Sequence, residues 1–531
     1  MSDRATENQK KVELADDRFI DVALAAAAES RACREVMTRL FILTITITLL
    51  SAVSAPPAPP GDQPLVLNDV HARLNATHVA EYHEPITKGE IVSLVKEAAR
   101  KGLAVSISGG RHSMGGQQFG KGTLHISLSR YNRVVGFDAV RGLVTVESGI
   151  QWPQLIDWLV ERQKGNEQAW GIRQKQTGAD RLTIGGALSS NIHGRGLTMK
   201  PIIGDIESFE LVDARAALRR CSREENPELF HLAIGGYGLF GVITEVTLKL
   251  SPRTKLERRV EIIGRPDVPR RVDERIRDGF LYGDFQFKTD EKADDFLQVG
   301  VFSFYRPVPI ATPIPASEES LSPGRWQELY LLAHLDKTRA FQTYADYYRS
   351  TDGQICWSDT HQMSYYLEGM DEKVDAALGS RAPGSLMITE LYVPRPRLPE
   401  FLERAAAALR ETKANLVYGT VRYIEKDDES FLAWARQSYA CTVMNLRVTH
   451  DDAGMDAARR QFQALIDVAL EMDGSYFLTY HRWARKDQVL KAYPQFPEFL
   501  RLKRRHDPDE RFQSDWYRHY KTMFASELAG S

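Results

Sequence analysis

A glycine-rich loop with one histidine is the first feature of this chain that could carry chemistry. Residues 106–117 read Ser-Ile-Ser-Gly-Gly-Arg-His-Ser-Met-Gly-Gly-Gln, so four glycines surround His112. Glycines at this density let a backbone turn sharply and bring its N–H groups close to an anion. A histidine inside such a loop lies beside whatever the loop binds. The combination indicates a nucleotide cofactor with a reactive ring.

Two further glycine-bearing segments follow. Residues 182–196 contain Gly185-Gly186 and His193-Gly194, and residues 235–244 contain Gly241-Val242-Ile243. Each pattern is weak by itself, because glycine-rich turns are common. The chain has no P-loop sequence, and no strand leads into Gly-x-Gly-x-x-Gly at the start of a helix. A nicotinamide site of the Rossmann type is therefore disfavoured.

The apolar periodicity predicts the elements that position these segments. Helices and strands alternate up to about residue 252, which favours an α+β or α/β domain. The predicted helices there are 88–100 and 152–163, and the strands are 102–107, 123–128, 143–147, 206–212 and 241–250. A second domain follows, a sheet with helices on one face. Its clearest elements are strands 296–302 and 385–393 and helices 399–413 and 456–472.

The composition excludes several classes of protein. A formal net charge of −2 over 531 residues, without a long basic stripe, gives no reason to expect a nucleic-acid partner. The four cysteines have no metal-ligand spacing, and four in a chain of this length do not make a disulfide scaffold. We therefore expect no metal site.

The N-terminal region has the pattern of an export signal. Residues 1–36 form a polar tail, and residues 40–61 carry no charge. Arg39, an apolar stretch and the small residues Val53-Ser54-Ala55 precede a proline-rich spacer, as at a secretory signal. Two interpretations stay open: translation starts at Met37, or the segment is an uncleaved anchor with a cytoplasmic tail. Both predict an exported or membrane-anchored protein on the periplasmic or cell-envelope side, and a buried strand is the alternative.

The order and spacing of the three glycine segments resemble the FAD-binding domain of the vanillyl-alcohol oxidase and p-cresol methylhydroxylase (PCMH) superfamily. The resemblance is strongest over residues 77–252. Tyr493-Pro494 and residues 506–516 look like the superfamily's sugar- and polyol-oxidising branch, which includes alditol oxidase and decaprenylphosphoryl-ribose oxidase. The resemblance implies an α+β fold. A PCMH-type FAD-binding domain of two α/β subdomains would be joined to a cap domain with an antiparallel sheet covered by helices.

These observations together predict five parts of the chain. They are the polar tail 1–36, the signal or anchor with its spacer 37–61, the FAD-binding domain 77–252, the cap or substrate domain 255–495, and a C-terminal segment 496–531 that returns to the FAD domain.

The resemblance also implies which residues hold FAD. The first loop would cradle the pyrophosphate, the second segment would follow the pyrophosphate and ribitol, and the third would reach the adenine half. The implied residues are Ser108, Gly109, Gly110, Arg111, His112, Ser113, Gln117, Thr183, Gly185, Gly186, Ser189, Ser190, His193, Gly194, Gly241, Val242 and Ile243.

In relatives with a histidine at the position of His112, the imidazole is joined covalently to the flavin 8α carbon. A loop histidine that only forms hydrogen bonds is the alternative here. Doubly linked relatives add a cysteine before the second glycine segment, where this chain has Thr177-Gly178-Ala179-Asp180. At most one covalent link is therefore expected.

The catalytic residues are less well defined. Relatives that oxidise sugars or polyols carry a lysine where this chain has Tyr480, so Tyr480 and His481 become the candidate bases. His193 resembles a histidine near the flavin edge, with a buried structural histidine as the alternative. Arg195 could counter a phosphate or the charge of reduced flavin. Glu390 and Arg422 lie on predicted strands, and a solvated strand face is the simpler interpretation for both.

The implied activity is FAD-dependent oxidation of an alcohol, a polyol, a sugar or a related CH–OH donor, by hydride transfer to flavin N5. Oxygen or a quinone-type membrane acceptor would take the electrons. Two alternatives stay open: an NAD(P)H-dependent flavin reductase on the same fold, and a membrane-tethered flavin-binding protein without turnover.

Overall fold

The computed structural model describes residues 65–315, 320–364, 367 and 369–529. The predicted polar tail and the predicted signal or anchor segment, residues 1–36 and 37–61, lie outside the described residues. Within the described part of the chain, no helix is long and apolar enough to cross a membrane.

A three-stranded parallel sheet leads into the first glycine loop. Its order is β3-β5-β4, with β3 at Glu81–His83, β5 at Leu124–Ser127 and β4 at Val105–Ser108. Helix α2 (Lys88–Lys101) buries Ile91, Val95 and Ala98; the Thr87 side chain caps its start and a left-handed Gly102 ends it. The glycine loop begins directly after β4.

A five-stranded antiparallel sheet carries the other two glycine segments. Its order is β10-β9-β11-β7-β6, and the second glycine segment opens helix α4, where the Thr183 side chain accepts from Gly186 N–H. The strands are β6 (Val134–Asp138), β7 (Leu143–Glu147), β9 (Ile206–Val212), β10 (Leu218–Ser222) and β11 (Val242–Lys249), and the helices are α3 (Trp152–Arg162), α4 (Ile184–Ser190) and α5 (Pro227–Ala233). Two short antiparallel pairs complete this region: β1 (Leu65–Leu67) with β2 (Thr77–Val79), and β8 (Trp170–Gly171) with β12 (Ser251–Pro252).

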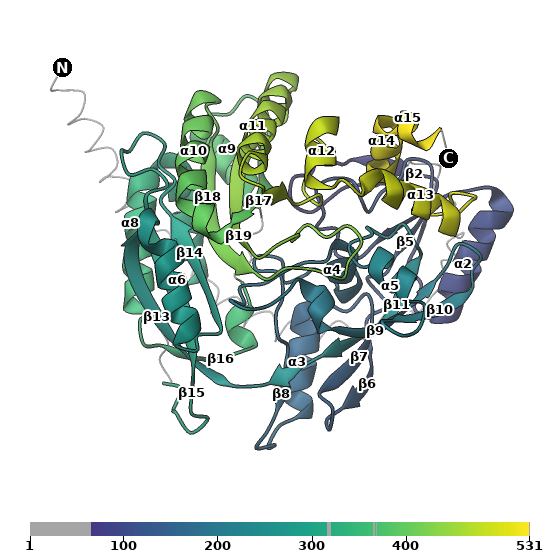
Figure 1. The fold of residues 1–531 in the computed structure, drawn as a ribbon, viewed down its shortest axis with the longest axis horizontal. Helices are drawn as coiled ribbons and strands as arrows, with labels where there is room; N and C mark the ends of the chain where they lie inside the picture. Colours follow the sequence, from purple (N-terminus) through teal and green to yellow (C-terminus); the bar gives the residue numbers. More distant parts are fainter. Residues whose placement is uncertain (1–64, 316–319, 365–366, 368, 530–531) are drawn as a thin grey trace, which may run out of the picture. The chain divides into compact units, whose positions relative to one another are not determined.

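An eight-stranded antiparallel sheet follows (Figure 1), in the order β16-β13-β15-β14-β18-β19-β17-β20. Its strands are β13 (Lys255–Gly264), β14 (Tyr282–Phe287), β15 (Val299–Val308), β16 (Ile355–Trp357), β17 (Gly384–Pro394), β18 (Leu416–Ile424), β19 (Tyr439–Thr449) and β20 (Ser475–Tyr476). The helices between them are α6 (Val268–Arg277), α7 (Pro323–Leu335), α8 (Lys337–Ser350), α9 (Met370–Leu378), α10 (Leu398–Glu411) and α11 (Asp452–Leu470). Short 3₁₀ turns lie at Ile202–Asp205, Arg265–Asp267, Thr360–Gln362 and Arg395–Arg397.

The two faces of this sheet differ in polarity. Residues directly opposite each other on antiparallel strands share a face, as do residues two apart on one strand. The register pairs Glu390 with Val443 and Val443 with Thr420, and it pairs Tyr392 with Cys441 and Cys441 with Arg422. One face therefore carries charged and polar side chains, which we call the polar face: Arg258, Asp284, Gln286, Ser303, Tyr305, Tyr418, Thr420, Arg422, Cys441, Glu390 and Tyr392.

The opposite face is mostly apolar and packs against helices. Phe285, paired with Val421, and Leu391 belong to the main hydrophobic core with Val268 of α6, Leu402 of α10 and Phe462 of α11. The polar face is covered by residues 173–196. Tyr282 Oη donates to the Arg173 carbonyl at 2.8 Å, and Gly196 forms an isolated bridge with Tyr282.

The C-terminal region packs back on the first sheet. Phe512 forms a parallel bridge with Val105 of β4, and Arg511 donates to the Leu103 carbonyl at 2.6 Å. This region contains α12 (Lys486–Ala492), α13 (Phe496–His506), α14 (Asp515–Met523) and α15 (Ala525–Leu528). The α+β fold with an antiparallel sheet covered by helices is confirmed, while the domain limits 77–252, 255–495 and 496–531 stay a proposal.

One predicted strand is displaced. The apolar residues of 296–302 predict a strand from Phe296, but β15 starts at Val299. Phe296 and Leu297 belong to a turn, in which Leu297 has φ 56° and its N–H donates to the Lys288 carbonyl at 3.1 Å. Their apolar side chains are buried from the turn, so the hydrophobic pattern extends beyond the strand.

Candidate functional site

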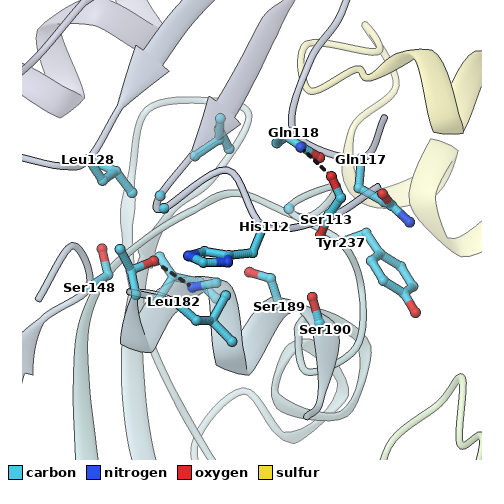
Figure 2. A pocket seen from close by; sticks show the side chains of 18 of the residues that line it. His112, Ser113, Gln117, Gln118, Leu128, Ser148, Leu182, Ser189, Ser190 and Tyr237 are labelled. Carbon is cyan, nitrogen blue, oxygen red and sulfur yellow. Dashed lines mark hydrogen bonds between the residues drawn. The ribbon is translucent and has the colours of Figure 1, made fainter. Parts of the chain in front are cut away.

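The three glycine segments line one cavity. Figure 2 shows His112 at its centre, with Ser113, Ser189 and Ser190 beside it and Leu182 and Ser148 on the far side. The lining residues are Ile107, Gly109, Gly110, Arg111, His112, Ser113, Gln117, Gln118, Leu128, Ser148, Leu182, Thr183, Gly185, Gly186, Ser189, Ser190, Tyr237, Gly238, Gly241 and Ile243. A concave site that combines apolar side chains with hydroxyl, amide and imidazole groups is suited to a cofactor.

Several glycines of the cavity allow contacts that no side chain would permit. A Cβ on Gly109 would lie 2.0 Å from Thr183 Oγ1, and one on Gly110 would lie 2.2 Å from the Arg181 carbonyl oxygen. A Cβ on Gly185 would lie 2.7 Å from Ser148 Cβ. The backbone of the first segment therefore packs directly against residues 181–183 at the start of the second. Closely spaced N–H groups and hydroxyls without a dedicated lysine fit the pyrophosphate of a dinucleotide.

His112 has a second histidine as its partner. His71 Nε2 and His112 Nδ1 are 2.7 Å apart, and both rings are largely withdrawn from solvent. Burial, with a smaller contribution from the charge of His71, lowers the pKa of His112 to about 3. His112 is therefore neutral at pH 7, and a neutral imidazole is the nucleophilic form of histidine.

A segment from the far end of the chain closes the first loop. Met114 and Gly115 both donate their N–H to the Thr479 carbonyl at 3.2 Å, and Gln117 Nε2 donates to the Leu478 carbonyl at 2.9 Å. Ser113 Oγ lies 3.2 Å from Thr479 Oγ1. Tyr480 follows directly, so residues 478–480 join the glycine loop to the polar face of the sheet.

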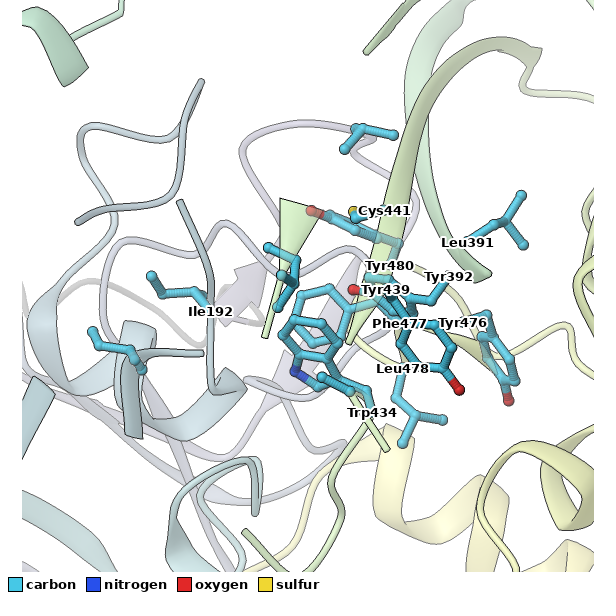
Figure 3. Packing of buried hydrophobic residues seen from close by; sticks show 14 of the residues in the cluster. Ile192, Leu391, Tyr392, Trp434, Tyr439, Cys441, Tyr476, Phe477, Leu478 and Tyr480 are labelled. Carbon is cyan, nitrogen blue, oxygen red and sulfur yellow. The ribbon is translucent and has the colours of Figure 1, made fainter. Parts of the chain in front are cut away.

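Glu390 is the centre of a buried cluster on that face, and its neighbours Tyr392, Cys441 and Tyr480 are labelled in Figure 3. Its Oε1 accepts from Tyr480 Oη at 2.7 Å, and its Oε2 accepts from Tyr392 Oη at 2.9 Å and contacts His193 Nε2 at 2.9 Å. Burial raises the pKa of Glu390, but the charge of His193, followed by Arg422 and the Tyr480 hydrogen bond, outweighs it and lowers that pKa to about 2. Glu390 is therefore an ionised carboxylate inside the protein.

The surroundings of His193 fix its hydrogen-bonding role. Nδ1 lies 3.1 Å from the Gly194 carbonyl and Nε2 faces the Glu390 carboxylate, so both neighbours are acceptors. An imidazole with two acceptor partners donates from both nitrogens and carries a positive charge. Burial and then Glu390 raise the pKa of Tyr480 well above its usual value, so its hydroxyl stays protonated and donates.

Three cationic side chains surround this cluster. Lys175 is fully buried and contacts Asp180 Oδ1 at 2.5 Å; burial lowers its pKa to about 8, against the opposing effect of Asp180. The positive charge of Lys175 helps to lower the pKa of His112 in the cavity. The positive charges of Arg195 and Arg422, on the polar face, in turn help to lower the pKa of Lys175. Lys175 thus links the cavity to the polar face.

The structure separates the predicted cofactor residues into two groups. Thirteen of them line the cavity: Gly109, Gly110, Arg111, His112, Ser113, Gln117, Thr183, Gly185, Gly186, Ser189, Ser190, Gly241 and Ile243. Ser108, Val242, His193 and Gly194 are not among its lining residues. Ser108 Oγ instead bonds His125 Nε2 at 2.8 Å, and the side chain of Val242 is buried in the core beneath α2.

The predicted catalytic residues also separate. Tyr480 and His193 meet at Glu390, whereas His481 packs against Phe462 and Trp483, with ring centroids 4.7 and 5.7 Å away. Burial lowers the pKa of His481 to about 3. This placement favours Tyr480 over His481, and the catalytic roles stay predictions.

The solvated-face interpretation of Glu390 and Arg422 is wrong, because their exposed fractions are 0% and 4%. Gln118, Leu128, Ser148, Leu182, Tyr237 and Gly238 line the cavity without having been predicted, and so does Ile107. Lys175 and Gln176 were also missed. The only signal in the sequence was the density of polar residues over 173–180, which is equally typical of a surface loop.

Comparison with known proteins supports the cofactor. The profile of the FAD binding domain family matches residues 80–222. The mitochondrial L-galactono-1,4-lactone dehydrogenase of Arabidopsis thaliana is 31% identical over 193 residues, 35% of this chain and 30% of the relative. The L-gulono-1,4-lactone dehydrogenase of Mycobacterium tuberculosis is 24% identical over 436 residues, 82% of this chain and 94% of the relative. A putative D-arabinono-1,4-lactone oxidase of Neurospora crassa is 30% identical over 175 residues, 33% of this chain and 30% of the relative.

The matches to the plant dehydrogenases span about a third of those proteins or less. The domain match coincides with the first two glycine segments and with the cavity they line. FAD is the cofactor of this protein, and the residues around the cavity fit it. Residues 80–222 therefore form an FAD-binding domain, and the chain is similar to dehydrogenases and a putative oxidase that are named for sugar lactones.

Proposed function

We propose that this protein is an FAD-dependent oxidoreductase that oxidises a CH–OH carbon of a sugar-like substrate, namely a polyol, a sugar or a sugar lactone. The observation that carries the proposal is the junction of the FAD cavity with the buried polar cluster through residues 478–480. The names of the relatives, lactone dehydrogenases and a putative lactone oxidase, support a sugar-like substrate.

Bound FAD supplies a two-electron acceptor for the hydride of the substrate C–H bond. The chain must then take the hydroxyl proton, so that the alcohol carbon becomes a carbonyl. Tyr480 Oη donates to the ionised Glu390, and its oxygen lone pairs remain able to accept a proton. The substrate proton passes to Tyr480 while the tyrosine proton passes to Glu390. His193 holds the carboxylate in place from its other oxygen.

The test is reduction of the flavin without oxygen. We expect the purified yellow protein to lose its absorbance near 450 nm with at least one member of a panel of polyols, aldoses and aldonolactones. Oxygen and a soluble quinone are then added separately to identify the acceptor. A protein that stays colourless when supplied with FAD, or a flavin that no panel member reduces, would contradict the proposal.

The same oxygen-free flavin-reduction assay tests the alternative that a nicotinamide nucleotide is the electron donor. Reduction by NADPH in the absence of an alcohol, faster than by any panel member, would favour a flavin reductase.

We also propose a single covalent bond between His112 and the flavin. The neutral ring and the 2.7 Å contact with His71, a group that can take the imidazole proton, support it. Acid precipitation checks this directly: the yellow colour should stay in the pellet of the wild-type protein and leave the pellet of His112→Ala. A colourless wild-type pellet would show that the flavin is bound without a covalent link.

Export or membrane attachment through residues 37–61 is a separate proposal. It is supported by the uncharged stretch of residues 40–61 and the small residues before the proline-rich spacer. Fractionation of cells that express the full chain, compared with a chain starting at Pro64, tests it. Equal distribution of both proteins would contradict it.

A further inference from the structure

Arg422 is a buried guanidinium without a hydrogen bond among the described residues. Its exposed fraction is 4%, and neither Nε nor Nη1 has a partner there. The Glu390 carboxylate offers it no free acceptor, because its two oxygens already contact four donors: Tyr480 Oη and Gln176 Nε2 at Oε1, and Tyr392 Oη and His193 Nε2 at Oε2. Leaving charged donors unsatisfied in the interior is costly, so such a group marks the position of a missing acceptor.

Arg195 covers the same face, and its guanidinium is also only partly hydrogen-bonded. Nη2 donates to the His361 carbonyl at 3.0 Å, Nη1 lies 3.9 Å from Asp284 Oδ1, and Nε has no partner among the described residues. Asp284 Oδ1 is also without a hydrogen bond, so at 3.9 Å the two groups attract each other but do not satisfy each other. The charges of Arg195 and Arg422 both act on Lys175 and on Tyr418, which places the two guanidiniums in one neighbourhood.

The balance of charge in this neighbourhood is positive. Three carboxylates, Asp180, Asp284 and Glu390, face five cationic side chains: Lys175, His193, Arg195, Arg258 and Arg422. Arg258 is satisfied by Ser303 Oγ at 3.1 Å and Thr351 Oγ1 at 3.0 Å and lies over the Tyr348 ring, which leaves Arg195 and Arg422 as the incomplete cations. Tyr418 is the one exposed residue of β18, at 38%, and it lies on the same face four residues before Arg422.

We propose that Arg195 and Arg422 bind a carboxylate of the substrate, which makes the substrate an acidic sugar such as an aldonic or uronic acid. This inference rests on the proposed function, because it names the substrate class of that site. A guanidinium presents parallel N–H donors that match the two oxygens of a carboxylate, and burial strengthens such charge-assisted bonds.

The experiment compares ligands that differ in this one group. D-gluconate and D-galacturonate carry a carboxylate, sorbitol and galactitol are neutral, and D-glucose 6-phosphate carries a phosphate. Binding to the FAD-loaded full chain is measured by calorimetry, and flavin reduction is measured in parallel without oxygen. The variants are Arg422→Gln, Arg422→Lys and Arg195→Gln. Arg141→Gln is the control, since Arg141 is 63% exposed and pairs with Glu207 at the surface.

We expect the acids to bind at least about tenfold more tightly than the neutral polyols. Losing the charge-assisted hydrogen bonds in Arg422→Gln should weaken acid binding by roughly 10- to 100-fold and change polyol binding less than about threefold. Arg422→Lys keeps the positive charge but loses the parallel N–H donors of the guanidinium. This variant should retain part of the preference for acids over neutral polyols. If Arg422→Gln does not fold, Arg422→Lys still tests the inference. The flavin absorbance spectrum of each variant shows whether that variant is folded.

Equal binding of acids and polyols by the wild-type protein would overturn the inference, and so would tighter binding of glucose 6-phosphate than of the acids. A parallel loss of acid and polyol binding in Arg422→Gln would also overturn it, since the arginine would then serve the flavin or a neutral substrate. Failure of the proposed function gives a different pattern. The acids would then still bind with the expected preference, but no ligand would reduce the flavin.

Discussion

Replacing Glu390 by glutamine tests whether the buried cluster is held together by charge. The ordinary pKa of a glutamate is 4.5, and that of Glu390 in the folded protein is about 2. Because the folded-state pKa is the lower one, this carboxylate stabilises the protein above pH 4.5 and loses that contribution as the pH falls toward 2. The full gap corresponds to about 3 kcal/mol, of which about 2 kcal/mol is lost between pH 5 and pH 3.

Glutamine keeps the shape of the side chain and one acceptor oxygen, but it has no charge to lose. At pH 5 we expect Glu390→Gln to be less stable than wild type by about 2–4 kcal/mol, since charged hydrogen bonds to Tyr392 and His193 are weakened. Between pH 5 and pH 3 the wild-type protein should lose about 2 kcal/mol more than the variant. Urea unfolding of both proteins at the two pH values, followed by tryptophan fluorescence, measures these differences.

Glu224→Gln is the matched control, because Glu224 is exposed and should show no such difference. The reasoning fails if Glu390→Gln and wild type lose the same free energy of unfolding between pH 5 and pH 3. In that case Glu390 would be protonated in the folded protein, and the charged form of His193 inferred from its two acceptor partners would be wrong as well.

Three further predictions concern the cofactor and the proton route. Gly110→Ala should reduce flavin content at least about tenfold, because its Cβ would lie 2.2 Å from the Arg181 carbonyl, while Gly89→Ala, with no atom within 4 Å, should leave the ratio of absorbance at 450 and 280 nm unchanged. Tyr480→Phe should slow flavin reduction by roughly 100-fold or more with a small change in KM, and an unchanged rate in stopped-flow would remove Tyr480 from the proton route. His71→Ala should slow the appearance of acid-stable yellow colour when apoprotein is mixed with FAD, and equal rates for variant and wild type would leave His71 without a role in the linkage.

Local patterns were sufficient for much of the fold. The strands β7 and β9 and the start of helix α3 lie where the apolar periodicity predicts them, because each is set by residues close in sequence. The FAD cavity was also predictable in large part, since dense glycine together with histidine and serine marks a backbone cradle. Val242 and Ser108 were predicted to contact FAD, but local structure turns both side chains away from the cavity. Strand alternation turns Val242 toward the core, and a neighbouring histidine engages the Ser108 hydroxyl.

The polar cluster could not be derived in the same way, because it depends on which surface covers a sheet. An alternating strand such as β17 or β18 predicts one apolar and one polar face, and a polar face is usually solvated. Here the apolar faces of β17 and β18 contribute to the main core, and residues 173–196 of the FAD-binding region cover the polar one. The same side chains that would be ordinary on a surface become, once covered, an ionised carboxylate and a guanidinium without a partner. Long-range packing, not the strand pattern, therefore gives Glu390 and Arg422 their chemistry, and the same packing connects Glu390 to the loop of His112 through residues 478–480.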